Sequence, residues 1–127
     1  MNGDRIVVWL CGVHSLGFAT FHVAFWRIFD WKNDLARCSV ANRAILQIAN
    51  LRLIYIFVAV AAACFFLPED MLGSRLGHAF LGGMSLFWVG RLVEQFVFLR
   101  HNRIIIHVLN VLFGLGAVLF AIPLLSP

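Results

Sequence analysis

Long runs of apolar residues, separated by short polar connections, dominate the chain. Four windows are almost wholly apolar: residues 5–29, 40–67, 75–99 and 104–125. A helix needs ~20 apolar residues to cross the hydrocarbon core of a bilayer, and each window is long enough. A membrane barrel would instead show alternating segments of ~10 residues, and the sequence has none. The pattern predicts an all-α integral membrane protein, with four transmembrane helices forming an antiparallel bundle in a single domain over residues 1–127.

The composition supports this class. The chain is 62% hydrophobic and only 13% charged, with a mean hydropathy of +0.92. Soluble domains are about half apolar and about a quarter charged, so a soluble chain of this size could not bury so much apolar surface. The first window is longer than the apolar region of a signal peptide, and no small-residue cleavage site ends it. We therefore expect a retained first span.

Basic residues near the connections predict the orientation. Lys and Arg in short loops favour the cytoplasmic side, and they are concentrated near the first and third connections. We therefore expect both termini on the non-cytoplasmic side. The net charge of +4 belongs to this asymmetry and does not indicate a nucleic-acid partner. No targeting signal is visible, which fits a bacterial inner membrane. The basic residues are Arg27, Lys32, Arg37, Arg43, Arg100 and Arg103 on one side, against Arg5 and Arg75 on the other.

Polar side chains from all four windows gather at one depth, ~6 to 15 Å inside the cytoplasmic ends of the predicted helices. A charged side chain at mid-bilayer costs at least ~2.5 kcal/mol, so it usually faces the protein interior and pairs. Glu94 is the one acid inside any window, and Arg91 or Arg43 could pair with it. The candidate ligand-binding residues are His22, Arg43, Gln47, Asn50, Arg91, Glu94, Gln95, His107 and Asn110.

Two interpretations of this polar layer stay open. In the first, the amides hydrogen-bond between helices and the arginines extend toward lipid phosphates, so the layer is structural. In the second, the layer carries net positive charge and binds an anionic or amphipathic ligand, such as a lipid headgroup or a quinone, or serves as a subunit in a membrane assembly. We favour binding, because a charged residue inside a membrane is costly and usually has a function. No catalytic residue is assigned.

The histidines suggest a third possibility, a haem-binding redox subunit. His14 and His78 are the best candidate axial pair, although their estimated depths differ by ~6 Å. A packing or hydrogen-bonding role is favoured for each histidine, and no metal site is predicted. The cysteines Cys11, Cys38 and Cys64 share no motif spacing, so they indicate neither a disulfide framework nor a zinc site.

The segment "RAILQIAN" (43–50) resembles the second-helix motif Arg-Ala-x-x-Asn-x-x-Glu of the membrane-associated proteins in eicosanoid and glutathione metabolism (MAPEG). Arg43 and Ala44 match that motif, while Gln47 and Asn50 stand where the family has Asn and Glu. The resemblance implies a four-helix homotrimer that binds glutathione between subunits. It also implies an enzyme that acts on a lipophilic substrate.

The resemblance continues in part on the third helix, where the family has an Arg followed by His and Tyr. This chain has Arg91, then Glu94, then Phe98, and His107 falls where a further family arginine would stand. The resemblance implies that Arg91 and Glu94 line the glutathione site together with the matched positions of the second helix. Because the acid, the tyrosine and that arginine are all replaced, glutathione-dependent catalysis is retained as an alternative function.

Overall fold

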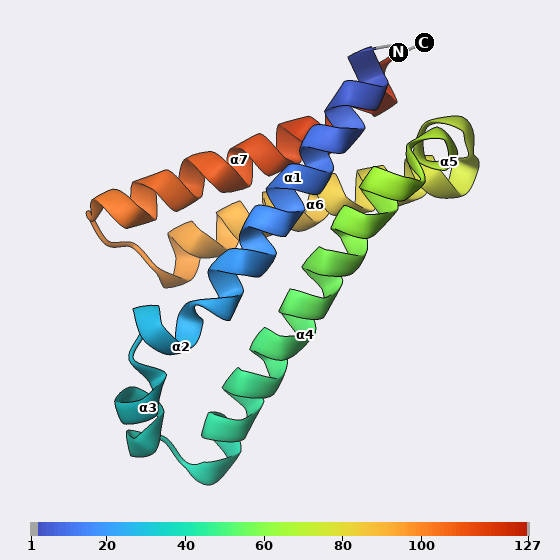
Figure 1. Cartoon of the computed structure of the whole chain (residues 1–127). Coiled ribbons are helices and arrows are strands. Elements are labelled where there is room, and N and C mark those ends of the chain that lie inside the picture. Colours follow the sequence, from blue (N-terminus) through green and yellow to red (C-terminus); the bar gives the residue numbers. More distant parts are fainter. Residues whose placement is uncertain (1–2, 127) are drawn as a thin grey trace. The chain divides into compact units, whose positions relative to one another are not determined.

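The computed structural model describes residues 3–126. Over this range every regular element is helical: α1 (Gly3–Val23), α2 (Phe25–Ile28), α3 (Trp31–Asp34), the 3-10 turn η1 (Leu35–Arg37), α4 (Val40–Phe66), α5 (Pro68–Gly73), α6 (Arg75–Phe98) and α7 (Ile104–Leu125) (Figure 1). Four of these helices, α1, α4, α6 and α7, are long and apolar enough to cross a membrane. The prediction of an all-α integral membrane protein with four spanning helices is confirmed.

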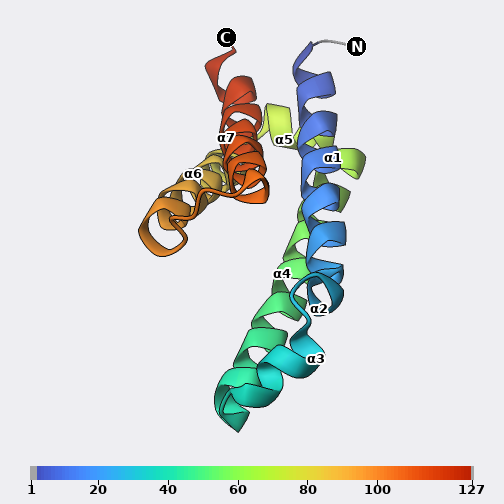
Figure 2. The same ribbon diagram turned by 90° about the vertical axis from the view of Figure 1, so that its left-hand side faces the viewer.

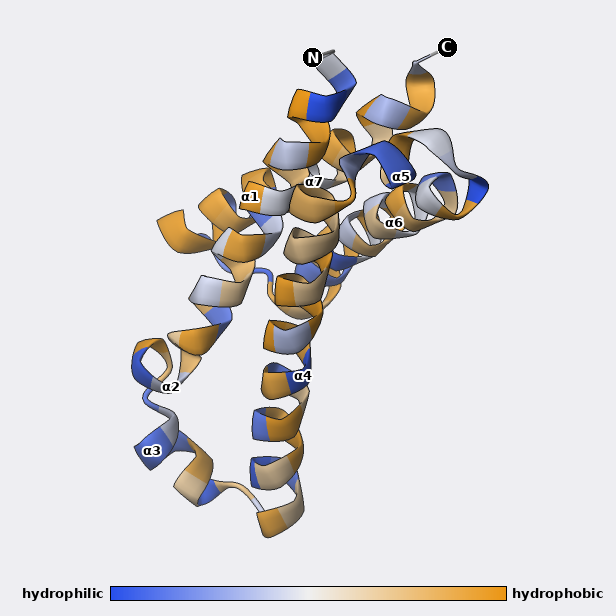
Figure 3. Cartoon of the chain, turned by 45° about the vertical axis from the view of Figure 1, so that its right-hand side comes forward, coloured by the Kyte–Doolittle hydropathy of each residue, from blue (hydrophilic) through white to orange (hydrophobic). Residues whose placement is uncertain are grey.

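The largest difference from the predicted windows is at the end of the first. α1 ends at Val23, because the backbone N–H of Ala24 is shared between the carbonyls of Thr20 and Phe21, at 3.2 and 3.1 Å, and the last turn tightens. The chain continues as the short helix α2 and then reaches Asp30, whose φ of 48° is left-handed. The other three windows agree with α4, α6 and α7 to within one residue. Figure 3 shows hydrophilic residues on α3, α5 and the start of α4, with hydrophobic residues prevailing along the long helices.

Contacts divide the chain into two compact units. Of the described residues, the first unit contains 3–11 and 64–126, and the second contains 12–63. The break falls within α1 and near the end of α4, so both of these helices supply residues to both units. The prediction of a single domain stays a prediction.

Within the first unit, α6 and α7 form the antiparallel pair that their short connection predicts (Figure 2). The ring of Trp88 stacks on that of Phe113, with centroids 5.7 Å apart and an angle of 19° between the planes. Nearer the other end of the pair, Ser85 Oγ donates a hydrogen bond of 2.8 Å to the carbonyl of Ala117. These two contacts fix the register in which α6 and α7 run past each other.

The short helix α5 packs tightly against the start of α6. A Cβ atom on Gly77 would lie 2.3 Å from the carbonyl oxygen of Asp70 and 2.5 Å from Met71 Cα, so only glycine fits this approach. Ser74 caps α6 by accepting a hydrogen bond of 2.9 Å from the Gly77 N–H. At the same polar end, Arg5 of α1 makes an ion pair with Glu69 of α5.

Within the second unit, the latter part of α1 runs antiparallel to α4. The rings of Phe18 and Phe57, both buried, have centroids 6.0 Å apart. Residues further along α1 and α2 contact residues progressively earlier on α4, as antiparallel helices require. The segment α2–α3–η1 connects the end of α1 to the start of α4.

Candidate ligand site

His22 and Asn50 form a closed polar pair between α1 and α4. The imidazole Nδ1 lies 2.6 Å from Asn50 Oδ1 and donates to it, and Asn50 Nδ2 donates to the His22 carbonyl at 2.9 Å. Asn50 is only 3% exposed, and the His22 ring is stacked on Phe25 with centroids 4.1 Å apart. Both ends of the Asn50 amide are therefore used within the protein. This geometry supports an interhelical hydrogen-bonding role for the pair.

One turn closer to the polar end, a chain of hydrogen bonds connects Trp26 to Arg43. The Trp26 indole N–H donates to Gln47 Oε1 at 3.0 Å, and Gln47 Nε2 donates to the Arg43 carbonyl at 3.1 Å. The Arg43 guanidinium in turn donates from Nε to the Leu35 carbonyl at 3.1 Å and from Nη2 to the Cys38 carbonyl at 3.4 Å. Arg43 is thus held against the loop by backbone oxygens, and no carboxylate within the described residues neutralises it.

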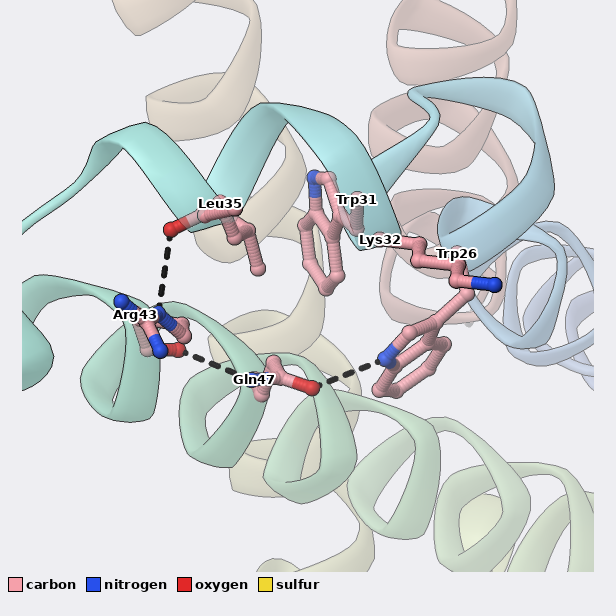
Figure 4. Close-up of a pocket in the computed structure, with 7 residues that line it drawn as sticks. Trp26, Trp31, Lys32, Leu35, Arg43 and Gln47 are labelled. Atoms are coloured by element: carbon pink, nitrogen blue, oxygen red, sulfur yellow. Dashed lines mark hydrogen bonds between the residues drawn. The ribbon is translucent and has the colours of Figure 1, made fainter.

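A pocket of about 260 Å³ lies beside this chain of hydrogen bonds, between α2, α3, η1 and the start of α4. Figure 4 shows the indoles of Trp26 and Trp31 beside Gln47, with Arg43 at one end. Lys32 is exposed on α3, and across residues 3–126 its ammonium group has no ion-pair partner. The lining residues are Trp26, Trp31, Lys32, Leu35, Ala36, Arg43 and Gln47.

The charged side chains that line the pocket are both positive. The two nearby acids, Asp30 and Asp34, belong to the same connection but do not line the pocket. Asp30 is engaged by the Asn33 amide, whose nitrogen lies 3.1 Å from both carboxylate oxygens. The pocket therefore offers two cations, an amide and two indole rings, and no acid.

The remaining candidate residues lie on the α6–α7 pair in the other unit. The Arg91 guanidinium lies over the Phe113 ring, 4.6 Å from its centroid, and makes no ion pair with Glu94 or any other described acid. Glu94 is exposed. Gln95 is 1% exposed, yet neither its amide nitrogen nor its oxygen has a hydrogen-bond partner in the described chain, and the same holds for Asn110 Oδ1.

Each of the remaining histidine candidates, His107, His14 and His78, has its own contacts. His107 is exposed and its Nε2 lies 2.8 Å from Asn102 Oδ1. His14 belongs to the second unit, where its ring is tilted against Phe18, with centroids 5.0 Å apart. His78 belongs to the first unit, and its Nε2 donates to the Leu72 carbonyl at 2.7 Å. In the described part of the chain, no three His, Cys, Asp or Glu side chains form a group that could hold a metal ion. The haem pair stays a prediction.

The candidate residues thus fall into separate groups. The structure brings His22 together with Asn50, and Arg43 together with Gln47. Arg91, Glu94, Gln95, His107 and Asn110 belong to the other unit, and a single layer shared by four helices stays a prediction. Trp31 and Lys32 line the pocket but were not among the candidate binding residues, and Lys32 was used only to predict the orientation. Their signal in the sequence is the combination of two tryptophans and a lysine in one polar connection, "WRIFDWK".

These features define an integral membrane protein of four spanning helices, with a basic, tryptophan-lined pocket at the polar end of α1 and α4. No family model, no curated protein and no solved structure matches the chain. The resemblance to the MAPEG family therefore stays a prediction that rests on the quoted motifs alone.

Proposed function

We propose that this membrane protein binds the anionic headgroup of an amphipathic molecule in the pocket formed by α2, α3, η1 and α4. The observation that carries the proposal is the convergence of Lys32 and Arg43, neither of them paired with an acid in residues 3–126, on one pocket beside two indole rings. A cation near a membrane surface attracts anionic lipid by about 1 kcal/mol, and two cations on one pocket add their effects.

Arg43 is suited to this task because it is already oriented. Two backbone carbonyls hold its Nε and Nη2, so little side-chain freedom is lost when a ligand binds. Its Nη1 makes no hydrogen bond within residues 3–126 and can donate to a phosphate or carboxylate oxygen. Lys32 supplies a second, mobile cation on the same pocket.

The size of the pocket selects the part of the ligand that enters. At about 260 Å³ it lies below the range of roughly 300–1,000 Å³ that encloses a drug-sized molecule. A phosphate or carboxylate headgroup fits, whereas acyl chains must remain outside. Exposed apolar residues on the nearby α4 surface, including Ile45 and Ile48, give such chains an apolar surface in the bilayer. Tryptophan is the residue that membrane proteins concentrate at this boundary between headgroups and hydrocarbon.

The experiment is native mass spectrometry of the protein in mild detergent, titrated with short-chain phosphatidic acid, with phosphatidylcholine or with glutathione. We expect phosphatidic acid to bind more tightly than phosphatidylcholine. We also expect Lys32→Gln to weaken the binding of phosphatidic acid by about fivefold, because about 1 kcal/mol of attraction is lost. Lys32 is the cleaner position to change, because Arg43 also holds the loop.

Arg27→Gln is the matched control. Arg27 is an exposed cation on α2 that does not line the pocket, so its loss removes the same charge from the same connection. We expect it to change binding less than twofold. Equal binding of both lipids together with an unaffected Lys32→Gln variant contradicts the proposal. Retention of glutathione by a trimer would favour the MAPEG-like enzyme instead.

A further inference from the structure

Beyond the first turn of each spanning helix, two charged side chains are exposed, Arg52 on α4 and Glu94 on α6. Arg52 places its guanidinium 5.6 Å from the centroid of the Tyr55 ring, which is itself exposed. Within residues 3–126 neither Arg52 nor Glu94 makes an ion pair. Arg91 interacts electrostatically with Glu94 but directs its guanidinium over Phe113. Charged groups on a lipid-facing surface are costly and normally find a partner, so both positions call for one outside the described contacts.

The chain contains one complement for Arg52 at membrane depth. Apart from Asp4 in the first turn of α1, Glu94 is the only acidic residue in the four long helices. We infer that a second copy of this chain supplies it, so that Arg52 on α4 of one copy pairs with Glu94 on α6 of the next. The apolar residues beside these charges, such as Leu51, Ile56, Val93 and Val97, are also exposed and would be covered by the same contact.

The depths of the two side chains permit this pair. When α4 and α6 both cross the bilayer, with one short helix between them, the start of α4 and the end of α6 face the same side. Arg52 lies twelve residues after the start of α4, ~18 Å along the axis, and Glu94 lies four residues before the end of α6, ~6 Å along it. The remaining ~12 Å is shortened from both sides, because side chains lean toward the N-terminus of their own helix. The Cα–Cβ bond of Arg52 therefore points toward the depth of Glu94, and that of Glu94 toward the depth of Arg52. The Arg52 guanidinium leaves the Tyr55 ring when the pair forms. Extended stems of about 6 Å for arginine and about 4 Å for glutamate then bring the charges within reach.

The surface around Glu94 admits a neighbouring helix. Gly83 and Gly90 are exposed on α6, and a Cβ atom built on either would meet nothing within 4 Å. Gly90 lies one turn before Glu94 on the same face, so a helix can approach the α6 backbone closely there. The Arg52–Glu94 pair can form twice across a two-fold axis between two copies, or once between each copy and the next in a ring.

Charge reversal tests the pairing. We expect Arg52→Glu alone and Glu94→Arg alone each to lower association at least tenfold, measured by native mass spectrometry and by co-purification of differently tagged copies. Mixing the two single variants should restore association between unlike copies only, because each then supplies the charge that the other lacks. The double variant Arg52→Glu/Glu94→Arg should associate with itself.

The neutral variants Arg52→Gln and Glu94→Gln guard against loss through misfolding, and each should associate more weakly than the wild type while keeping its circular dichroism. Arg27→Glu, on the exposed face of α2 outside the spans, is the control and should leave association unchanged. A monomeric wild-type protein, association that survives both single reversals, or failure of the mixed variants to associate would each overturn the inference. Binding of phosphatidic acid at the pocket is measured separately, so its outcome is independent of this one.

Discussion

The two groups of polar residues differ in how completely they are hydrogen-bonded. Between α1–α2 and α4, the amides of Asn50 and Gln47 each both donate and accept within the protein. Between α6 and α7, the buried amide of Gln95 has no hydrogen-bond partner in residues 3–126. The same residue type, glutamine, therefore holds helices together in one place and leaves hydrogen-bonding capacity unused in the other. A buried amide without a hydrogen-bond partner destabilises the folded protein. Asn50 and Gln47 therefore have a structural role, whereas Gln95 needs another explanation.

The origin of the difference lies in what faces each amide. Opposite Asn50 and Gln47 the chain places His22 and Trp26, whose ring nitrogens can donate. On the α6–α7 pair, Phe113 offers a ring face to the Arg91 guanidinium, and the Gln95 amide has no hydrogen-bond partner in residues 3–126. Cation–π contact satisfies a guanidinium in part, whereas an amide needs a directional donor or acceptor.

Loss of the closed pair should give the largest effect. We expect Asn50→Ala to lower the free energy of unfolding by about 2 kcal/mol, because the two hydrogen bonds between the buried Asn50 amide and His22 are lost. The measurement is reversible unfolding in mixed micelles with increasing sodium dodecyl sulfate, followed by tryptophan fluorescence. Asn42→Ala, at an exposed position on the same helix, should change it by less than about 0.5 kcal/mol. Equal effects of the two substitutions would contradict a structural role for the pair.

The sequence predicted most helix bounds but few of the side-chain partners. The bounds of α4, α6 and α7 follow from apolar runs that stop at polar connections, so hydropathy located them. The end of α1 did not follow, because apolar residues continue past Val23 and the break depends on hydrogen bonds at Ala24 and the backbone of Asp30. Polar residues within apolar windows were easily recognised as candidates. Their partners were not, because the partner of Arg91 depends on the rotation of two helices about their axes, and the sequence suggested Glu94 where the structure has Phe113.

Replacing the two glutamines by leucine should give effects of opposite sign. Gln47→Leu removes hydrogen bonds to Trp26 and Arg43, so we expect it to destabilise by about 1 kcal/mol. Gln95→Leu removes a buried amide that has no partner in the described chain, so we expect it to stabilise by about 1 kcal/mol. The two substitutions are chemically identical, so each serves as the control for the other in the same micelle unfolding measurement. A destabilising Gln95→Leu would show that this amide binds a water, a ligand or another copy in the membrane.

The smallest effects are expected at two serines, and they test whether the hydrogen bond or the unit determines the cost of a polar side chain. Ser85 on α6 donates to the Ala117 carbonyl on α7, whereas Ser15 on α1 is fully buried and its hydroxyl has no hydrogen-bond partner in residues 3–126. The two serines invert the pattern of the glutamines, because here the bonded residue lies in the α6–α7 unit and the unbonded one in the other. We expect Ser85→Ala to destabilise by about 0.6 kcal/mol, the average for one interhelical hydrogen bond in a membrane, and Ser15→Ala to be neutral or slightly stabilising. Ser85→Ala stays milder than Asn50→Ala because it leaves only a backbone carbonyl with one bond fewer. If both serine variants instead followed the behaviour of the glutamine in their own unit, the unit rather than the hydrogen bond would determine the cost of a polar side chain.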